Sequence, residues 1–470
     1  MKYKFSGSLI FLYIAFFFAG CQSYEPAPLD INSYRSGLEK RLINIEPITA
    51  FASRIATTGE VPVQFDTSDG ISPSEGEVIA LFYNPELRIA RLEASAALAN
   101  YETSGLWKDP VFGFNGAKIS SPSQPFQFGL MANVSIPLSG RLKVEKARAG
   151  TMYETQLMKL INEEWNIRSE LRQQWVKWTT ATLQVPLIQE VIVQLEKIIS
   201  IADSLVEVGE INRVEYRLLT VELASYKVKA TEATLHLLEE ELALVGLMGL
   251  PADSVDYLIA TFPNRQTTVV EDETARLIDA NTELAILFAE YKTAEETLRL
   301  EIKKQFPDIE FGSGYGSEFN DHRVLFGLSI PLSIWNRNQA GIANARAQRE
   351  VARAEAETAF ARIFRELTLA NTSLLIKKTQ RSFYENDIIP MLEDQSTDII
   401  QIVELGEVDT FILLETVTRQ YDAKNQLLQL QADEINASID VHRILGPEYR
   451  LHPSPIHREQ TIKETLGGVQ

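Results

Sequence analysis

The chain contains two copies of one pattern, and this duplication limits the folds that it can adopt. Four short motifs recur in the same order in both halves. The paired motifs begin at Asn84 and Asn281, at Ser135 and Ser329, at Val208 and Leu405, and at Met248 and Leu445. Three of the four separations are 197 residues and the remaining one is 194. A repeat this regular predicts a fold built from two copies of one helix–hairpin–helix–helix module.

Long helical patterns separate these motifs. Residues 142–207 contain no glycine after Gly150 and one proline, Pro186, and residues 339–404 form the matching stretch of the second copy. A helix of that length extends about 100 Å. Apolar residues recur in alternating steps of three and four along the long helix and along the helix that returns after it, which is the pattern of a coiled-coil seam. We therefore expect two antiparallel helical hairpins, with tips at 208–211 and 405–408.

Two strand-like segments precede each long helix. Apolar residues alternate with small or polar ones along 126–136 and 323–330, and partner strands are predicted at 110–117 and 307–316. The resulting β-hairpins span about 109–137 and about 307–332. Strands of about 9–11 residues suit a tilted crossing of a membrane. A half-buried strand of a soluble sandwich would show the same alternation, so the strands alone leave both alternatives open.

The ends of these patterns divide the chain. The predicted units are a signal peptide (1–20), an extended N-terminal segment (21–73), a first repeat (74–251), a second repeat (252–446) and a C-terminal tail (447–470). Within the first repeat, we expect one ascending helix from Ser74 to Leu106 that starts with a capping box formed by Ser74 and Glu77. We further expect the returning helix 212–248 to stack end to end on the ascending helix 274–305.

The first twenty residues resemble the signal peptide of a bacterial lipoprotein. Lys2 and Lys4 precede an apolar run over 9–18 that is too short to span a membrane as a helix. Small residues then stand directly before Cys21, the only cysteine of the chain. The four residues that end at Cys21 resemble a lipobox, which predicts lipidation of this cysteine, for example with palmitate; a buried structural cysteine is the alternative. By the sorting rule for such lipoproteins, Gln22 implies passage to the outer membrane.

The charge argues against one class of partner. The net charge is −19, and it becomes −21 when Lys2 and Lys4 leave with the signal peptide. An acidic chain is a poor ligand for nucleic acid. After residue 20, no apolar stretch is long enough for a transmembrane helix, so insertion into a membrane would have to use strands or the lipid.

No pattern predicts an enzyme, a cofactor or a metal site. The histidines stand at positions 236, 322, 442, 452 and 457, and no two of them have the i, i+4 spacing of metal ligands on a helix. We find no phosphate-binding loop. We therefore expect no catalytic residues and no cofactor apart from covalent lipid on Cys21, and any energy for transport must come from a partner protein.

Taken together, the motifs over about 74–446 resemble the TolC-type outer-membrane efflux channels, in particular the lipoprotein outer-membrane factors of tripartite metal and drug efflux pumps. They include Asn-x-Glu-Leu helix starts, hairpins that end in Ile-Pro-Leu, and tips with Gly-Glu followed by an apolar residue. The resemblance implies a homotrimer in which two hairpins per chain form a 12-stranded β-barrel on a 12-helix α-barrel. The residues alone show only that four strands cannot close a barrel, which leaves two, three or four copies open.

The resemblance also implies a function. It implies a passive exit channel, lipid-anchored in the outer membrane with a long periplasmic extension, which docks to a periplasmic adaptor protein and an inner-membrane pump and conducts small molecules or cations outward. An alternative of another class is a structural periplasmic coiled-coil lipoprotein without channel activity, whose hairpins pack in a soluble head.

A gate is expected at the helical tips. Its candidate residues are Gly209, Glu210, Glu215, Gly406, Glu407, Asp409 and Glu415. Threefold symmetry would turn each acidic position into a ring of three charges, which selects cations. Glu415 stands nine residues after Gly406, where an acidic residue lines the closed gate in the family. The alternatives for these acids are solvated loop positions or contacts with the adaptor.

Overall fold

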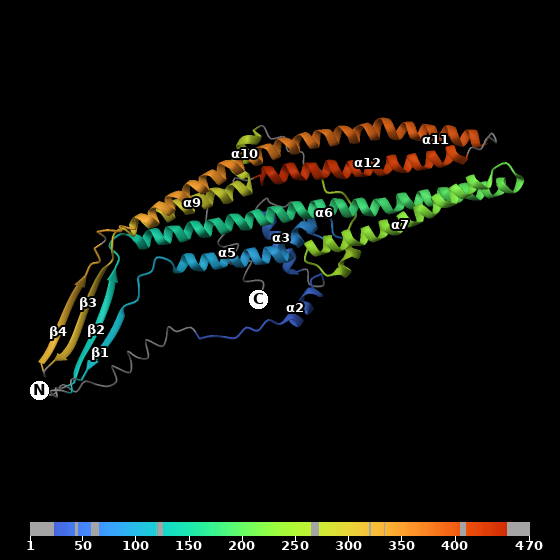
Figure 1. The fold of residues 1–470 in the computed structure, drawn as a ribbon. Coiled ribbons are helices and arrows are strands. Elements are labelled where there is room, and N and C mark those ends of the chain that lie inside the picture. The colour runs from blue at the N-terminus through green and yellow to red at the C-terminus, as the bar shows by residue number, and fades with distance from the viewer. Residues whose placement is uncertain are drawn as a thin grey trace. The chain divides into compact units, whose positions relative to one another are not determined.

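The computed structural model describes residues 23–42, 46–57, 65–118, 120, 126–264, 272–318, 321–332, 334–404 and 410–448. The chain divides into two units, Met1–Asn44 and Ile45–Gln470. The first unit contains α2 (Ile31–Leu38), which Asp30 caps by accepting the backbone N–H groups of Asn32 and Ser33 at 3.0 and 3.1 Å. Every other element belongs to the second unit (Figure 1).

The two hairpins form one antiparallel sheet with the strand order β1-β2-β3-β4. The strands are β1 (Val111–Ala117), β2 (Gln127–Ile136), β3 (Ile309–Glu318) and β4 (Asp321–Ser329). β2 and β3 come from different repeats and pair along their length, with Ile136 opposite Ile309 and Phe128 opposite Ser317. The sheet therefore joins the two repeats, and β1 and β4 form its edges.

Helices make up most of the second unit, which confirms the mainly helical class with a pair of hairpins. Before the second hairpin these are α3 (Glu46–Thr57), α4 (Pro73–Tyr83), α5 (Pro85–Thr103), α6 (Arg141–Val208), α7 (Arg213–Leu247), the 3₁₀ helix η1 (Ala252–Tyr257), α8 (Glu273–Ala280) and α9 (Thr282–Lys303). After it follow α10 (Gln339–Phe383), the π-helical turn η2 (Tyr384–Ile388), α11 (Ile389–Glu404) and α12 (Thr410–Leu445).

The ascending helix of each repeat is broken at its Asn-x-Glu-Leu motif, so the continuous helices predicted over 74–106 and 274–305 are wrong, although Asn281 does stand at a helix start. α4 and α5 are separated at Asn84, and α8 and α9 are separated at Asn281. Because Pro85 disfavours the helical conformation of the residue before it, Asn84 adopts ψ 129°. The predicted capping box is also displaced by two residues: Ser72 Oγ accepts the Glu75 N–H at 3.4 Å, and the Ser72 N–H donates to the Glu75 carboxylate at 2.8 Å.

The duplicated asparagines join two helices end to end. Asn84 Nδ2 donates to the carbonyl of Leu247 at the end of α7 (2.9 Å), and Asn281 Nδ2 donates to the carbonyl of Ile444 at the end of α12 (2.7 Å). Their Oδ1 atoms accept N–H groups from the first turns of α5 and α9. α7 therefore stacks on α5, and α12 stacks on α9. The predicted stack of the first returning helix on the second ascending helix is wrong, because each returning helix meets the ascending helix of its own repeat.

Stacked pairs and long helices alternate in one layer. α6 packs against α5 and α7 on one side and against α9 and α12 on the other, and α10 packs against α9 and α12 (Figure 1). Tyr226 of α7 and Tyr421 of α12 meet edge to face beside Ile188 and Leu195 of α6, with ring centroids 5.5 Å apart. Burial raises the pKa of Tyr226 to about 12, so this phenol stays neutral at physiological pH.

The two prolines in the long helices have different surroundings. α6 continues without interruption through Pro186. Pro390 instead comes directly after η2, where the Ile389 N–H bonds to the carbonyl of Tyr384. Pro390 has no N–H and cannot continue the α-helical bonding, and the helix widens into a π-helical turn directly before it. Of the two long helices, the second one is therefore interrupted.

Removing the Asn281 side chain should destabilise the second stack. Asn281 is 5 % exposed, and its loss leaves the Ile444 carbonyl and the Leu284 N–H without these partners, at a cost of about 2 kcal/mol. We expect Asn281→Ala to lower the midpoint of thermal unfolding, followed by far-UV circular dichroism in detergent. Asn100 is exposed on α5 and its side chain makes no hydrogen bond in the described structure, so Asn100→Ala is the matched control. Equal midpoints for the two variants would contradict the stabilising role of the Asn281 hydrogen bonds.

Candidate functional site

The sheet has one apolar face and one face of small or polar residues. Residues directly opposite one another in the ladder share a face, so the register assigns every side chain. The apolar face carries Phe112, Phe114, Phe128, Leu130, Val134, Phe311, Tyr315, Val324, Phe326 and Leu328, with Ser313, Ser317 and His322 as its polar residues. The other face is mostly small or polar: it carries Gly113, Asn115, Asn133, Ser135, Gly312, Gly314, Gly316, Arg323 and Gly327, with Val111, Met131 and Leu325 as its large apolar residues. Within the described residues the apolar face is uncovered, since Phe112, Phe114 and Phe326 are 70 %, 62 % and 75 % exposed.

Each side of the layer ends in a strand with one open edge and a helix with an exposed apolar stripe. β1 and β4 each pair with one neighbour in the sheet. On α7, an exposed apolar stripe follows heptad spacing on the side away from α6, through Val214, Leu218, Val221, Val228, Leu235 and Leu242. On α10, Leu369, Ile376 and Phe383 are exposed at intervals of seven residues. Such stripes are typical of helices that pack against a further helix.

α6 separates the two faces of the layer. Trp175 Nε1 donates to the carbonyl of Ile259 and Thr179 Oγ1 donates to that of Thr261, both at 3.3 Å, so one face is occupied by the segment that follows η1. α4 packs on the same face, where Gly76 lies against the Trp175 ring. The opposite face carries Glu163, whose pKa is raised by burial and by the nearby charges of Glu86 and Glu170. One face of α6 is thus covered by other elements, and the opposite face carries Glu163 near Glu86 and Glu170.

The first tip is a compact turn that Gly209 closes. Gly209 has φ +83°, its N–H bonds to the carbonyl of Val206 at 3.2 Å, and the Glu210 N–H bonds to that of Leu205 at 3.0 Å. This pair of bonds is a Schellman motif, which requires the left-handed conformation at Gly209. Ile211 then turns inward and is buried against α6 and α7. Glu210 is left exposed on the turn.

Glu215 has a local role at the start of α7. Asn212 Oδ1 accepts the N–H groups of Val214 and Glu215 at 2.8 and 3.0 Å, and Asn212 Nδ2 donates to the Glu215 carboxylate. A carboxylate in the first turn also complements the helix dipole. Glu215 therefore stabilises the first tip.

Glu415 lies on α12 and is paired. Its carboxylate is 48 % exposed and accepts from Arg419 Nε at 2.6 Å, one turn further along the helix. Arg419 was not among the predicted site residues, although its i, i+4 spacing from Glu415 indicates the pair. Leu413, Leu414 and Val417 of α12 pack on the cluster below Gly209, so Glu415 shares one end of the unit with the first tip. Cys21, Gly406, Glu407 and Asp409 lie outside the described residues.

Two further properties bear on the site. Throughout the described part of the chain, no three His, Cys, Asp or Glu side chains are grouped so that they could hold a metal ion. Among the helices of the same ranges, none combines the length and the apolar character needed to cross a bilayer.

Comparison with solved structures decides the fold. The chain superposes on the CmeC outer membrane channel of Campylobacter jejuni with a TM-score of 0.71 at 14 % identity, covering 87 % of this chain and 93 % of that one. A membrane protein from Pseudomonas aeruginosa gives 0.70 at 16 % identity, covering 84 % and 97 %, and CusC gives 0.68 at 18 %, covering 82 % and 97 %. The fold is that of the TolC-type outer-membrane channels. The resemblance inferred from the sequence is thereby confirmed at the level of fold.

Sequence comparison adds one relative. No family model matches the chain. The cobalt-zinc-cadmium resistance protein CzcC of Cupriavidus metallidurans is 22 % identical over 243 residues, which cover 51 % of this chain and 58 % of that protein. The match thus spans little more than half the length of this curated relative, although the TolC-type fold covers most of the chain.

Proposed function

We propose that this chain forms a passive exit channel in the outer membrane, as one component of a tripartite efflux pump. The uncovered apolar face of the sheet carries the proposal. Strands that alternate between an apolar and a small or polar face are those that cross a membrane with lipid on one side and a lumen on the other. The long helices would then extend into the periplasm, as the TolC-type fold implies. The similarity to channel proteins supports a role without catalysis.

The open edges support a closed ring of copies. An unpaired strand edge cannot face lipid, because each N–H and C=O group left without a partner costs several kcal/mol there. Pairing β4 of one copy with β1 of the next would remove both edges, and the same contact would bring the α10 stripe against the α7 stripe. A contact between two different surfaces repeats around a ring. Three copies would give a homotrimer with a 12-stranded β-barrel on a 12-helix α-barrel, the number that the resemblance implies.

The remaining parts of the proposal concern the ends of the chain. Cys21 would carry the lipid anchor. The tip end, with Gly209, Glu210, Glu215 and Glu415 in the structure, would form the periplasmic gate together with Gly406, Glu407 and Asp409 and would dock to an adaptor protein and an inner-membrane pump. Small molecules and cations are the proposed cargo, and the similarity to CzcC makes divalent metal cations one class to test.

Two neighbouring substitutions test the membrane placement. Phe326 and Leu325 are 75 % and 52 % exposed and lie on opposite faces of β4. Arginine on the lipid face near the middle of a strand costs about 2–4 kcal/mol, whereas a lumen-facing arginine does not. We expect Phe326→Arg to reduce the amount of assembled protein in the outer-membrane fraction several-fold and Leu325→Arg to leave it unchanged. Equal effects of the two variants would contradict the membrane placement.

The proposed gate role of Glu415 predicts opposite changes in cation selectivity for two variants. If Glu415 lines a constriction, its carboxylate attracts cations and Arg419 partly neutralises it. Glu415→Ala should therefore reduce cation selectivity, and Arg419→Ala should increase it. The reversal potential across planar bilayers in a salt gradient measures both. Unchanged selectivity in both variants would refute the gate role of Glu415 while leaving the channel itself intact.

A further inference from the structure

A surface cavity of about 580 Å³ lies where α5, α6 and α9 approach the sheet. It is lined by Tyr101, Trp107, Lys143, Lys146, Gly150 and Lys292, among others. Two glycines shape it. Gly105 has φ +71°, and a Cβ atom there would lie 2.6 Å from the Leu142 carbonyl oxygen, while a Cβ at Gly150 would come within 3.2 Å of the Tyr101 ring. The glycines therefore allow the end of α5 to approach α6 closely beneath the first strand.

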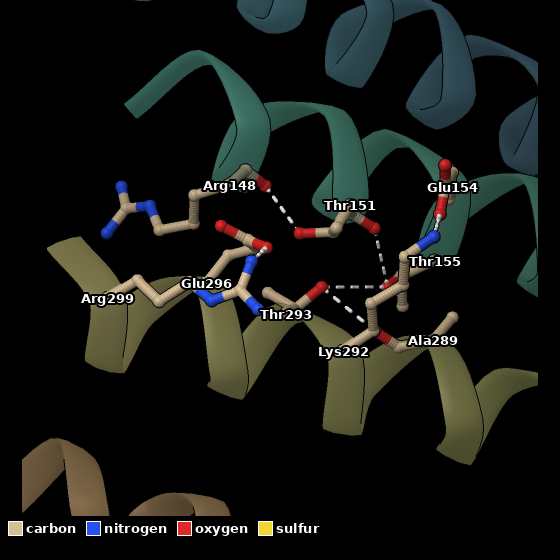
Figure 2. Close-up of polar contacts among 9 residues, drawn as sticks. All are labelled: Arg148, Thr151, Glu154, Thr155, Ala289, Lys292, Thr293, Glu296 and Arg299. Atoms are coloured by element: carbon tan, nitrogen blue, oxygen red, sulfur yellow. Dashed lines mark hydrogen bonds and ion pairs between the residues drawn. The ribbon is translucent and has the colours of Figure 1, made fainter. Parts of the chain in front are cut away.

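The unneutralised charge in this cavity is positive. Its two carboxylates are paired: Glu154 accepts from Lys292 Nζ at 2.7 Å, and Glu296 accepts from Arg299 at 2.7 Å (Figure 2). Lys143 and Lys146 are exposed, and neither has a carboxylate partner among the described residues. Lys146 Nζ instead lies 5.4 Å from the centroid of the Tyr101 ring. α6 also begins here at the N-cap Gly140, which has no side chain, while Ser139 Oγ accepts the Arg141 N–H at 3.3 Å. The positive end of the helix dipole adds to the two lysines.

Part of the lining of the cavity lies on the covered face of α6. Glu154 and Thr151 line it. Glu154 precedes Trp175 by three whole heptads, and Thr151 precedes Thr179 by four. All four residues therefore lie on one side of a supercoiled helix. Trp175 and Thr179 hold the segment that follows η1. In a closed ring this covered face must be outside, because the elements on it would otherwise fill the lumen.

We propose that this cavity binds the headgroup of an anionic phospholipid from the membrane leaflet nearest to the helices. The inference rests on the proposed function, since it requires the sheet to lie in a membrane. Trp107 is exposed and stands four residues before β1 begins at Val111, at the depth where tryptophan and tyrosine anchor proteins to the headgroup region. Lys143 and Lys146 are then placed to bind the phosphate, with their aliphatic stems along the apolar surface.

The test uses the full chain reconstituted into vesicles of phosphatidylglycerol or phosphatidylcholine, with retained lipid counted by native mass spectrometry. We expect Lys143→Gln/Lys146→Gln to retain at least fivefold less phosphatidylglycerol per copy than the wild type. Lys177→Gln/Lys197→Gln makes the same charge change on exposed positions of α6, at least about 50 Å from Lys143 along the helix. This control should retain wild-type amounts, and phosphatidylcholine should not distinguish the variants.

The possible failures are separable. A wild-type protein that inserts into neither vesicle would overturn the proposed function. A protein that inserts but retains as much phosphatidylglycerol in the site variant as in the wild type would overturn the headgroup site alone. Displacement of the lipid by millimolar inorganic phosphate would also overturn it, since the site would then recognise a free anion. If the double variant fails to insert, each single lysine variant must still retain at least twofold less phosphatidylglycerol per copy than the wild type.

Discussion

The arrangement of this molecule depends on one hydrogen-bonded joint that occurs twice. A single asparagine side chain at each joint bonds the last turn of a returning helix and caps the first turn of an ascending helix, at Asn84 and at Asn281. α6 is 68 residues long, and neither α5 nor α7 alone can lie along all of it. Because the joints hold two shorter helices in line, each stack extends beside a long helix, and the layer keeps four columns from the sheet to the tips.

The second joint leaves no room for a side chain. Gly446 has φ +77°, and a Cβ atom there would lie 1.9 Å from the carbonyl oxygen of Ala280. The αL turn at the end of α12, in which the Gly446 N–H bonds to the carbonyl of His442 at 3.0 Å, thus packs directly on the last turn of α8. This close approach fixes the direction of α9, which packs along α6 and leads into β3. The positions of the sheet and of the tips therefore follow from contacts in the middle of the unit.

Local patterns predicted much of this structure, and long-range contacts account for what they missed. Heptad spacing and alternation predicted the long helices, the first tip and the strands, because each depends on neighbours in sequence. The break at Asn84 was missed although Pro85 indicates it, since the apolar pattern continues through both helices. The partner of α7 depends on a bond between Asn84 and Leu247, 163 residues apart, and no local period encodes that pairing. Arg419 stands four residues after Glu415 in the sequence, but only the structure shows that the two side chains are paired.

Closure of the layer is the central claim, because the described residues of a single chain leave two strand edges and two apolar helical stripes without partners. The protein mass of the complex in detergent, measured by light scattering with the detergent contribution subtracted, tests it most directly. The account predicts three chains per complex, each close to the 52.9 kDa of the full sequence. A stable single chain would contradict closure, and a complex of two or four chains would contradict the trimer.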